Sequence, residues 1–195
     1  MDKTVFLDRD GTIIEEMGYI NHFSRIKPLP EAIEAIKLFR DYGFRVIVLT
    51  NQAGVARGYF SEEALLEMNE YMLRQFDQQG ATIDALYYCP HHPEGKIEQY
   101  RKDCDCRKPK TGMVKQAMKD LNFKLELAWI IGDRDSDIEL ANNLGIGSAY
   151  VLTGYGKGEY VKEKGLFKSK PRLIFNDVLQ AAQTIVNYCS GIENG

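Results

Sequence analysis

The chain has 195 residues, of which 44% are hydrophobic and 27% are charged, and its formal net charge is -3. This composition excludes collagen-like, disordered and disulfide-scaffold proteins, and the length predicts that residues 1–195 form a single domain. Because basic and acidic residues nearly balance, no strong global field favours nucleic acid or an anionic membrane as a partner.

No uninterrupted apolar stretch approaches the roughly 20 residues of a membrane-spanning helix. The short apolar segment near the amino terminus ends at Asp8, so neither an anchor nor a signal peptide is predicted. We therefore expect a cytoplasmic protein. In a reducing compartment its four cysteines are expected to be thiols or metal ligands rather than disulfides.

Short apolar runs alternate with segments of helical periodicity along the chain. Strands are predicted at residues 4–7, 46–49, 83–88, 127–131, 149–153 and 173–175. Helices are predicted at residues 30–42, 61–80, 113–121, 135–144 and 178–188. This order predicts an α/β fold with an open, mainly parallel, Rossmann-like sheet and helices on both faces, which binds ligands beyond the carboxyl ends of its strands.

Polar residues suited to chemistry directly follow the predicted strands, as this architecture requires. Two carboxylates, Asp8 and Asp10, lie two residues apart after the first strand, where an extended backbone points both side chains the same way. Such carboxylates repel each other unless a hard cation such as Mg²⁺ lies between them, and Asp133 would complete the site. Asp137, four residues further on, would ligate the ion or orient a ligand. The alternative is that Asp10 begins an ordinary turn.

Four motifs in order resemble those of the haloacid-dehalogenase-like phosphatase superfamily. They are DRDGT from Asp8, TNQ from Thr50, KP from Lys108 and GDRDSD from Gly132. The resemblance implies a phosphoric monoester hydrolase.

The resemblance implies that Asp8 attacks phosphorus to form an aspartyl-phosphate. It also implies that Asp10 protonates the leaving group and later deprotonates water. Mg²⁺ would be held by the Asp8 side chain, the Asp10 carbonyl and Asp133. Thr50 would hydrogen-bond the phosphoryl oxygens, and Lys108 would offset their charge.

A cluster of cysteine and histidine residues predicts a structural zinc site. Cys89, His91, Cys104 and Cys106 provide three thiolates and an imidazole around residues 89–109, a polar loop with little apolar material of its own. Zinc would replace the missing core of this loop. The alternatives are unconnected thiols or a disulfide between Cys104 and Cys106, which would be strained across so short a loop. His92 is expected at the surface.

Within the superfamily, the pattern is similar to that of enzymes that act on a small sugar bisphosphate. This similarity implies the following substrate-binding residues: Glu16, Met17, Gly18, Tyr19, Asn51, Gln52, Ala53, Gly54, Arg57, Arg107 and Lys108. Arg57 and Arg107 are chemically suited to bind the second phosphate, or are ordinary surface residues. The short gaps between motifs leave no room for a large cap domain, and a monomer is expected.

Three other functions remain open at this point. A histidinol-phosphate phosphatase shares the aspartates and a similar zinc loop, which is typically shorter. A polynucleotide 3′-phosphatase is disfavoured because the chain has no long basic, aromatic-rich stretch. A noncatalytic zinc-stabilised module would have no need of Asp8, Lys108 and Asp133 together.

Overall fold

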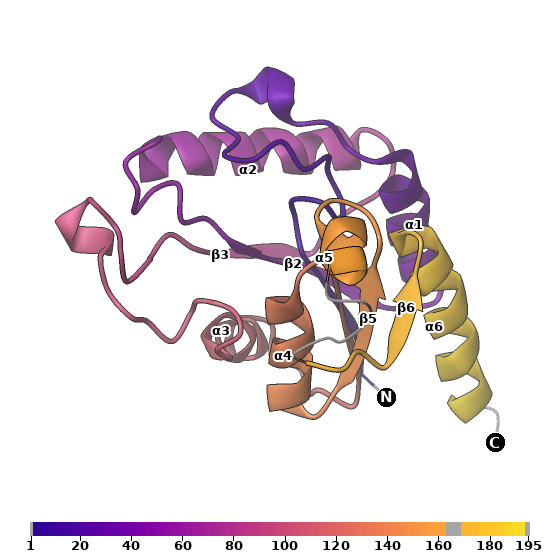
Figure 1. The fold of residues 1–195 in the computed structure, drawn as a ribbon. Helices are drawn as coiled ribbons and strands as arrows, with labels where there is room; N and C mark the ends of the chain where they lie inside the picture. The colour runs from indigo at the N-terminus through magenta and orange to yellow at the C-terminus, as the bar shows by residue number, and fades with distance from the viewer. Residues whose placement is uncertain (1, 163–168, 194–195) are drawn as a thin grey trace.

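A six-stranded sheet forms the centre of the computed structural model, which describes residues 2–162 and 169–193 (Figure 1). Residues 1, 163–168 and 194–195 of the predicted domain lie outside the described residues. The strands are β1 (Lys3–Leu7), β2 (Arg45–Asn51), β3 (Ala85–Cys89), β4 (Leu127–Gly132), β5 (Gly147–Val151) and β6 (Leu173–Phe175). Their order is β3-β2-β1-β4-β5-β6, and every neighbouring pair is parallel. This sheet confirms the predicted α/β class.

Helices cover both faces of the sheet. The longer ones are α1 (Pro30–Asp41), α2 (Glu62–Asp77), α3 (Gly112–Leu121), α4 (Asp135–Leu144) and α6 (Val178–Glu193), and the short ones are α5 (Gly156–Lys162), η1 (Phe23–Arg25) and η2 (Glu98–Tyr100). Helices α1, α2 and α6 pack on one face, and α3 and α4 pack on the other. Among the described residues, no helix has both the length and the apolar character needed to cross a membrane.

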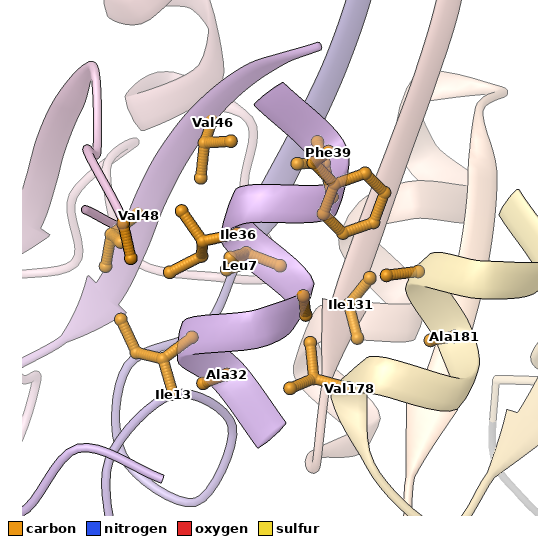
Figure 2. Packing of buried hydrophobic residues seen from close by; sticks show 14 of the residues in the cluster. Leu7, Ile13, Ala32, Ile36, Phe39, Val46, Val48, Ile131, Val178 and Ala181 are labelled. Atoms are coloured by element: carbon orange, nitrogen blue, oxygen red, sulfur yellow. The ribbon is translucent and has the colours of Figure 1, made fainter. Parts of the chain in front are cut away.

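Alternation along the strands explains the two apolar layers. In β1, Val5 and Leu7 point into the cluster beneath α1 and α6, whereas Phe6 points into the cluster beneath α3 and α4. Figure 2 shows Leu7 packed with Ile36 of α1. Because both faces of the sheet are buried, its strands are continuous apolar runs, and the polar residues come directly after them.

Local sequence sets where the helices begin and end. Pro30 occupies the start of α1, where its missing amide proton costs no hydrogen bond. Ser61 caps α2, and its hydroxyl accepts a hydrogen bond from the Ala64 amide at 3.2 Å. Gly145 ends α4 in the left-handed conformation with φ of 67°.

Several elements differ in extent from the sequence-based predictions, and one was not predicted. Strand β3 begins at Ala85 because the preceding Asp84 uses its carboxylate to accept the Val46 amide at 2.7 Å. Strand β5 ends at Val151, and Thr153 beyond it turns to donate its hydroxyl to the Gly11 carbonyl. Helix α5 has no counterpart among the predicted elements.

The order of the strands places a crevice at one end of β1. The chain runs outward from β1 through β2 to β3 and, on the other side, through β4 to β6, so the connections diverge between β1 and β4. Leu7 is paired with Ile131, and the Asp8 amide donates to the Ile131 carbonyl at 2.9 Å. This register brings Asp8 and Asp133 to the same edge of the sheet.

Candidate active site

A cleft of about 360 Å³ opens beyond the carboxyl ends of the strands. It is lined by Asp8, Asp10, Glu16, Gly18, Tyr19, Thr50, Asn51, Gln52, Ala53, Gly54, Arg107, Lys108, Arg134, Ser136 and Tyr155. The cleft is therefore built from the loops after β1, β2, β4 and β5, together with the segment that precedes α3.

Lys108 is a buried cation beneath this cleft. Its Nζ lies 2.7 Å from Asp8 Oδ1 and 2.6 Å from Asp137 Oδ1, and it donates to the Leu49 carbonyl at 2.7 Å. Burial disfavours the ammonium, but the two carboxylates outweigh burial and raise the pKa of Lys108 above its ordinary value. The side chain is thus held as a cation beside the carboxylate of Asp8.

One lysine does not balance the three carboxylates of Asp8, Asp133 and Asp137, whose oxygens lie within 4.8 Å of one another. Burial, together with the charges of the other two, raises the pKa of Asp133 to about 9. Burial and Asp8 likewise raise the pKa of Asp137 to about 7, although Lys108 acts in the opposite direction. The cluster therefore has an excess of negative charge that a divalent cation would neutralise.

Only one of the two oxygens of the Asp133 carboxylate accepts a hydrogen bond. Oδ2 accepts the Tyr155 amide at 2.8 Å, whereas the buried Oδ1 has no hydrogen-bond partner. Gly11, with φ of 82°, and Gly154 close around this carboxylate, and a Cβ at either position would lie 2.3 Å from Oδ2. A buried carboxylate oxygen without a partner, in an all-oxygen donor set, fits a hard cation such as Mg²⁺.

Asp10 lies at the cleft but outside that carboxylate group. Arg9 donates to both of its oxygens at 3.0 Å, and Gln52 donates to Oδ2 at 2.8 Å. Its carboxylate is thus held apart from Asp8. The participation of its backbone carbonyl in metal binding remains a prediction.

The end of β2 positions the residues expected to hold a phosphoryl group. The Asn51 side chain accepts from the Lys108 amide at 3.0 Å and donates to the Lys108 carbonyl at 3.1 Å, which fixes the backbone beside the cation. The buried Thr50 hydroxyl accepts from Gln52 Nε2 at 2.9 Å. Thr50, Asn51 and Lys108 thereby occupy one wall of the cleft.

The four predicted zinc ligands come together. The thiol sulfurs of Cys89, Cys104 and Cys106 are 3.1–3.4 Å apart, and His91 Nδ1 lies 3.3 Å from the Cys106 sulfur. Ligands of one tetrahedral zinc ion are roughly 3.5–3.8 Å apart, so this arrangement is compatible with zinc and only slightly tighter. All three cysteines are free thiols. Contact with Cys89 lowers the pKa of Cys106 to about 5, which favours a thiolate.

The zinc-ligand loop, residues 89–109, is also tied to the rest of the molecule by hydroxyl groups. Tyr88 of β3 and Tyr100 of the loop donate to the two oxygens of Glu62 in α2, at 2.9 and 2.7 Å. Arg107 donates to the His91 carbonyl at 3.4 Å and lines the cleft. The loop therefore presents Arg107 and Lys108 to the cleft from a fixed position.

Two of the predicted substrate-binding residues lie away from the cleft lining. Met17 packs against the apolar cluster. Arg57 lies with its NH2 group 3.4 Å from Nε2 of His92, and its buried Nε has no hydrogen-bond partner. His92 is itself half-buried rather than fully at the surface. The structure brings the other predicted substrate residues to the cleft.

Three cleft residues are absent from the sequence-based set. The Arg134 guanidinium lies 3.6 Å from the centre of the Tyr155 ring and pairs with Glu159 at 2.8 Å. Ser136, in the first turn of α4, also lines the cleft. Arg134 and Ser136 belong to the motif after β4, and Tyr155 follows β5, so the rule that functional residues follow parallel strands identifies all three.

Comparisons with known proteins agree with this geometry. A family model described as HAD-hydrolase-like matches residues 105–181. The chain is 39% identical over 164 residues to the D-glycero-beta-D-manno-heptose-1,7-bisphosphate 7-phosphatase of Haemophilus influenzae, covering 81% of this chain and 89% of that protein. It is 35% identical over 158 residues to the D-glycero-alpha-D-manno-heptose-1,7-bisphosphate 7-phosphatase of Photorhabdus laumondii, covering 80% of this chain and 86% of that protein.

A solved structure is also similar over almost the full length. The D,D-heptose 1,7-bisphosphate phosphatase of B. bronchiseptica, crystallised with magnesium and phosphate, has 27% sequence identity and a TM-score of 0.81. The match covers 95% of this chain and 99% of that one.

Proposed function

This chain belongs to the D-glycero-D-manno-heptose-1,7-bisphosphate 7-phosphatase family of haloacid-dehalogenase-like hydrolases, and we propose that it removes the C7 phosphate of that sugar bisphosphate in a magnesium-dependent reaction. The observation that carries the proposal is the arrangement of Asp8 at the cleft: one oxygen lies 2.7 Å from Lys108, within a carboxylate group whose Asp133 Oδ1 has no partner. This arrangement supports a site in which a nucleophile, a cation for phosphoryl charge and a metal ion meet at one point.

In the first half of the proposed reaction, an Asp8 oxygen forms a bond to phosphorus while the bond from phosphorus to the sugar O7 breaks. Asp10 transfers a proton to O7, because a sugar alkoxide is a poor leaving group without one. In the second half, Asp10 takes a proton from water as the water oxygen attacks phosphorus. The Asp8–phosphorus bond then breaks, and phosphate and free Asp8 result.

The other residues of the cleft hold the transferring group. Lys108 offsets its negative charge, and Thr50 donates a hydrogen bond to a phosphoryl oxygen. Asp8 and Asp133, with the Asp10 carbonyl, would hold Mg²⁺, which supplies positive charge to the phosphoryl oxygens when it is bound. Asp137 contacts Lys108 directly, so we propose that it orients the lysine rather than binding the ion.

Arg107 is the residue that we propose for the second phosphate. Lys108 is occupied by two carboxylates, whereas Arg107 lies on the cleft wall with a single backbone carbonyl contact among those that the described residues make. A planar guanidinium binds phosphate through paired donors. The cleft volume of about 360 Å³ is at the small end of the range for small-molecule sites, which favours a single sugar over a polymer.

Phosphate release from the α and β anomers of heptose 1,7-bisphosphate, compared with histidinol phosphate, tests the proposal. We expect magnesium-dependent turnover of at least one heptose anomer with a kcat/KM at least about 10-fold above that for histidinol phosphate, and phosphorus NMR should show that the C1 phosphate is retained. A preference for histidinol phosphate, or loss of the C1 phosphate, would reject the assignment.

A further inference from the structure

The carboxylate of Asp10 is clamped by its own chain neighbour. Arg9 donates from Nε to Asp10 Oδ2 and from NH2 to Oδ1, each at 3.0 Å, and only 3% of the Arg9 side chain is exposed. Adjacent residues of an extended strand point to opposite faces. Here β1 ends at Leu7, and the Arg9 carbonyl accepts the amides of the turn that follows, so the two side chains meet.

Asn69 of α2 holds the far end of the Arg9 side chain. Its Oδ1 accepts from Arg9 NH1 at 2.7 Å, across 60 positions of sequence. Asn69 is 4% exposed and lies on the buried face of α2, whose other buried residues are Leu65, Met68, Met72 and Phe76. An amide in an apolar stripe costs free energy unless its polar atoms are paired.

Only the acceptor half of that amide is used. Asn69 Nδ2 is buried and has no hydrogen-bond partner. The interaction with Arg9 is therefore the polar contact that compensates for placing Asn69 in the apolar layer. We conclude that the Asn69 side chain holds the guanidinium in place and does not stabilise α2.

We propose that Arg9 and Asn69 are positioning residues that aim Asp10 for proton transfer, an inference that deepens and rests on the proposed function. Asp10 Oδ2 accepts from both Arg9 and Gln52, whereas Oδ1 accepts from Arg9 alone. Oδ1 consequently has capacity left for the proton that passes to the leaving oxygen. Without Asn69 the guanidinium loses its anchor, and the carboxylate loses its direction.

Leaving-group dependence distinguishes this role from a structural one. A sugar oxygen needs a proton as its bond to phosphorus breaks, whereas p-nitrophenolate departs as a stable anion and needs none. Because Asp10 also activates water in the second half of the reaction with either ester, the comparison is made on the first half, as leaving-group release in a single turnover with enzyme in excess. We expect Asn69→Leu to lower this rate about 10-fold for the sugar bisphosphate and Arg9→Met about 100-fold, with the single-turnover rate for p-nitrophenyl phosphate changed less than about threefold in Asn69→Leu. Asn69→Asp keeps the acceptor that the structure uses, and we expect it to restore the sugar-phosphate rate to within about threefold of wild type.

Arg40→Met is the matched control. Arg40 donates to both oxygens of Asp84 at 2.9 Å, so it forms a similar arginine–aspartate pair, but at the amino-terminal edge of the sheet. The ratio of its single-turnover rates for the sugar phosphate and the nitrophenyl phosphate should equal that of wild type. Equal losses of the single-turnover rate on both substrates in Asn69→Leu, or no loss on either, would overturn the inference.

The same measurements separate this inference from the proposed function. If wild type does not hydrolyse heptose bisphosphate, the substrate proposal fails, and the ratio is then measured with a hexose 6-phosphate, whose leaving oxygen also needs a proton. If wild type hydrolyses neither type of ester, both proposals are rejected together.

Discussion

At the scale of single residues, the site is governed by an imbalance of charge. Lys108 contacts Asp8 and Asp137, and no cation in the described part of the chain is recorded within ion-pair distance of Asp133. The raised pKa values of Asp133 and Asp137 are the consequence, because each carboxylate is buried beside another. Removing one charge from this group should therefore affect chemistry and stability in opposite directions.

Asp8→Asn is the sharpest case. We expect it to lower phosphate release by at least about 10⁴-fold, since an amide does not attack phosphorus. The metal-free protein should be unchanged in stability or more stable, by on the order of 1 kcal/mol, because a charge that repels Asp133 and Asp137 is gone. Steady-state assays and thermal unfolding check the two halves. Appreciable turnover would refute the assignment of the nucleophile.

Lys108→Met should act on stability in the other direction. It removes the cation that compensates Asp8 and Asp137 and leaves their carboxylates buried without a compensating charge, at a cost of roughly 3–5 kcal/mol in magnesium-free buffer. Urea unfolding measures this loss. Lys115→Met, at an exposed position of α3, is the control and should change stability by less than about 0.5 kcal/mol. A similar effect of the two substitutions would contradict the role of the buried pair.

Residue identity and spacing indicate some of these positions and conceal others. Asp8 is identifiable because it follows an apolar run, and the predicted zinc ligands are identifiable because thiols and imidazole recur at close spacing. Asn69 is not identifiable from the sequence, because its role depends on a hydrogen bond with Arg9, and only the fold brings these two residues together. For Arg57, the charge suggested an anion site, which stays a prediction, and the contact that the fold gives its guanidinium is with His92.

At the scale of elements, the zinc-ligand loop has little regular structure to support it besides its predicted metal ligands. Between Cys89 at the end of β3 and Gly112 at the start of α3, the regular structure consists of η2. Arg107 and Lys108 follow Cys106 directly, so any loosening of the loop reaches the cleft.

Cys104→Ser should therefore lower zinc content and stability before it affects the chemical step. We expect bound zinc to fall well below one ion per chain and the Tm to fall by roughly 5–10 °C. KM should rise more than kcat falls, because Arg107 is displaced while Asp8 and Asp10 keep their contacts. Elemental analysis, thermal unfolding and steady-state kinetics give these quantities. Cys189→Ser, a buried cysteine in α6, controls for the loss of a buried thiol, and its zinc content should be unchanged. Wild type that lacks zinc and is normally stable would remove the structural role.

The elements that periodicity predicts are those with strong local signals. Helix α2 has a serine cap and acidic residues in its first turn, and it was predicted close to its observed start. Helix α5 was not predicted, because Gly156 and Gly158 are weak helix formers and give no signal for the start of a helix. Strand β5 was predicted from residue 149 but begins at Gly147, which pairs with Trp129 of β4. A Cβ at Gly147 would lie only 2.4 Å from the Trp129 ring, and this need for glycine is a tertiary contact that the local sequence does not reveal.

At the scale of the whole molecule, the carboxylate group couples folding to pH and to magnesium. In the metal-free protein, the pKa of Asp133 is raised to about 9 and that of Asp137 to about 7, whereas an unfolded aspartate titrates near pH 4. Between about pH 4 and pH 9, the folded state thus binds protons that the unfolded chain has released. The free energy of unfolding must then fall as pH rises through this window.

Magnesium should reverse that slope, because it binds the deprotonated carboxylates of the folded state and competes with their protons. The experiment uses magnesium-free buffer and protein whose bound zinc has been verified. Between pH 5 and pH 8.5, we expect this carboxylate group to lower the free energy of unfolding by a few kcal/mol and the Tm with it. Added magnesium should raise the Tm more at pH 8.5 than at pH 5. Asp133→Asn should flatten both dependences, since it removes the carboxyl group with the most strongly raised pKa and the oxygen without a partner. The contrary outcome is a Tm of magnesium-free wild type that depends on pH in the same way as that of Asp133→Asn. It would show that the carboxylates are neutralised by something other than a divalent cation.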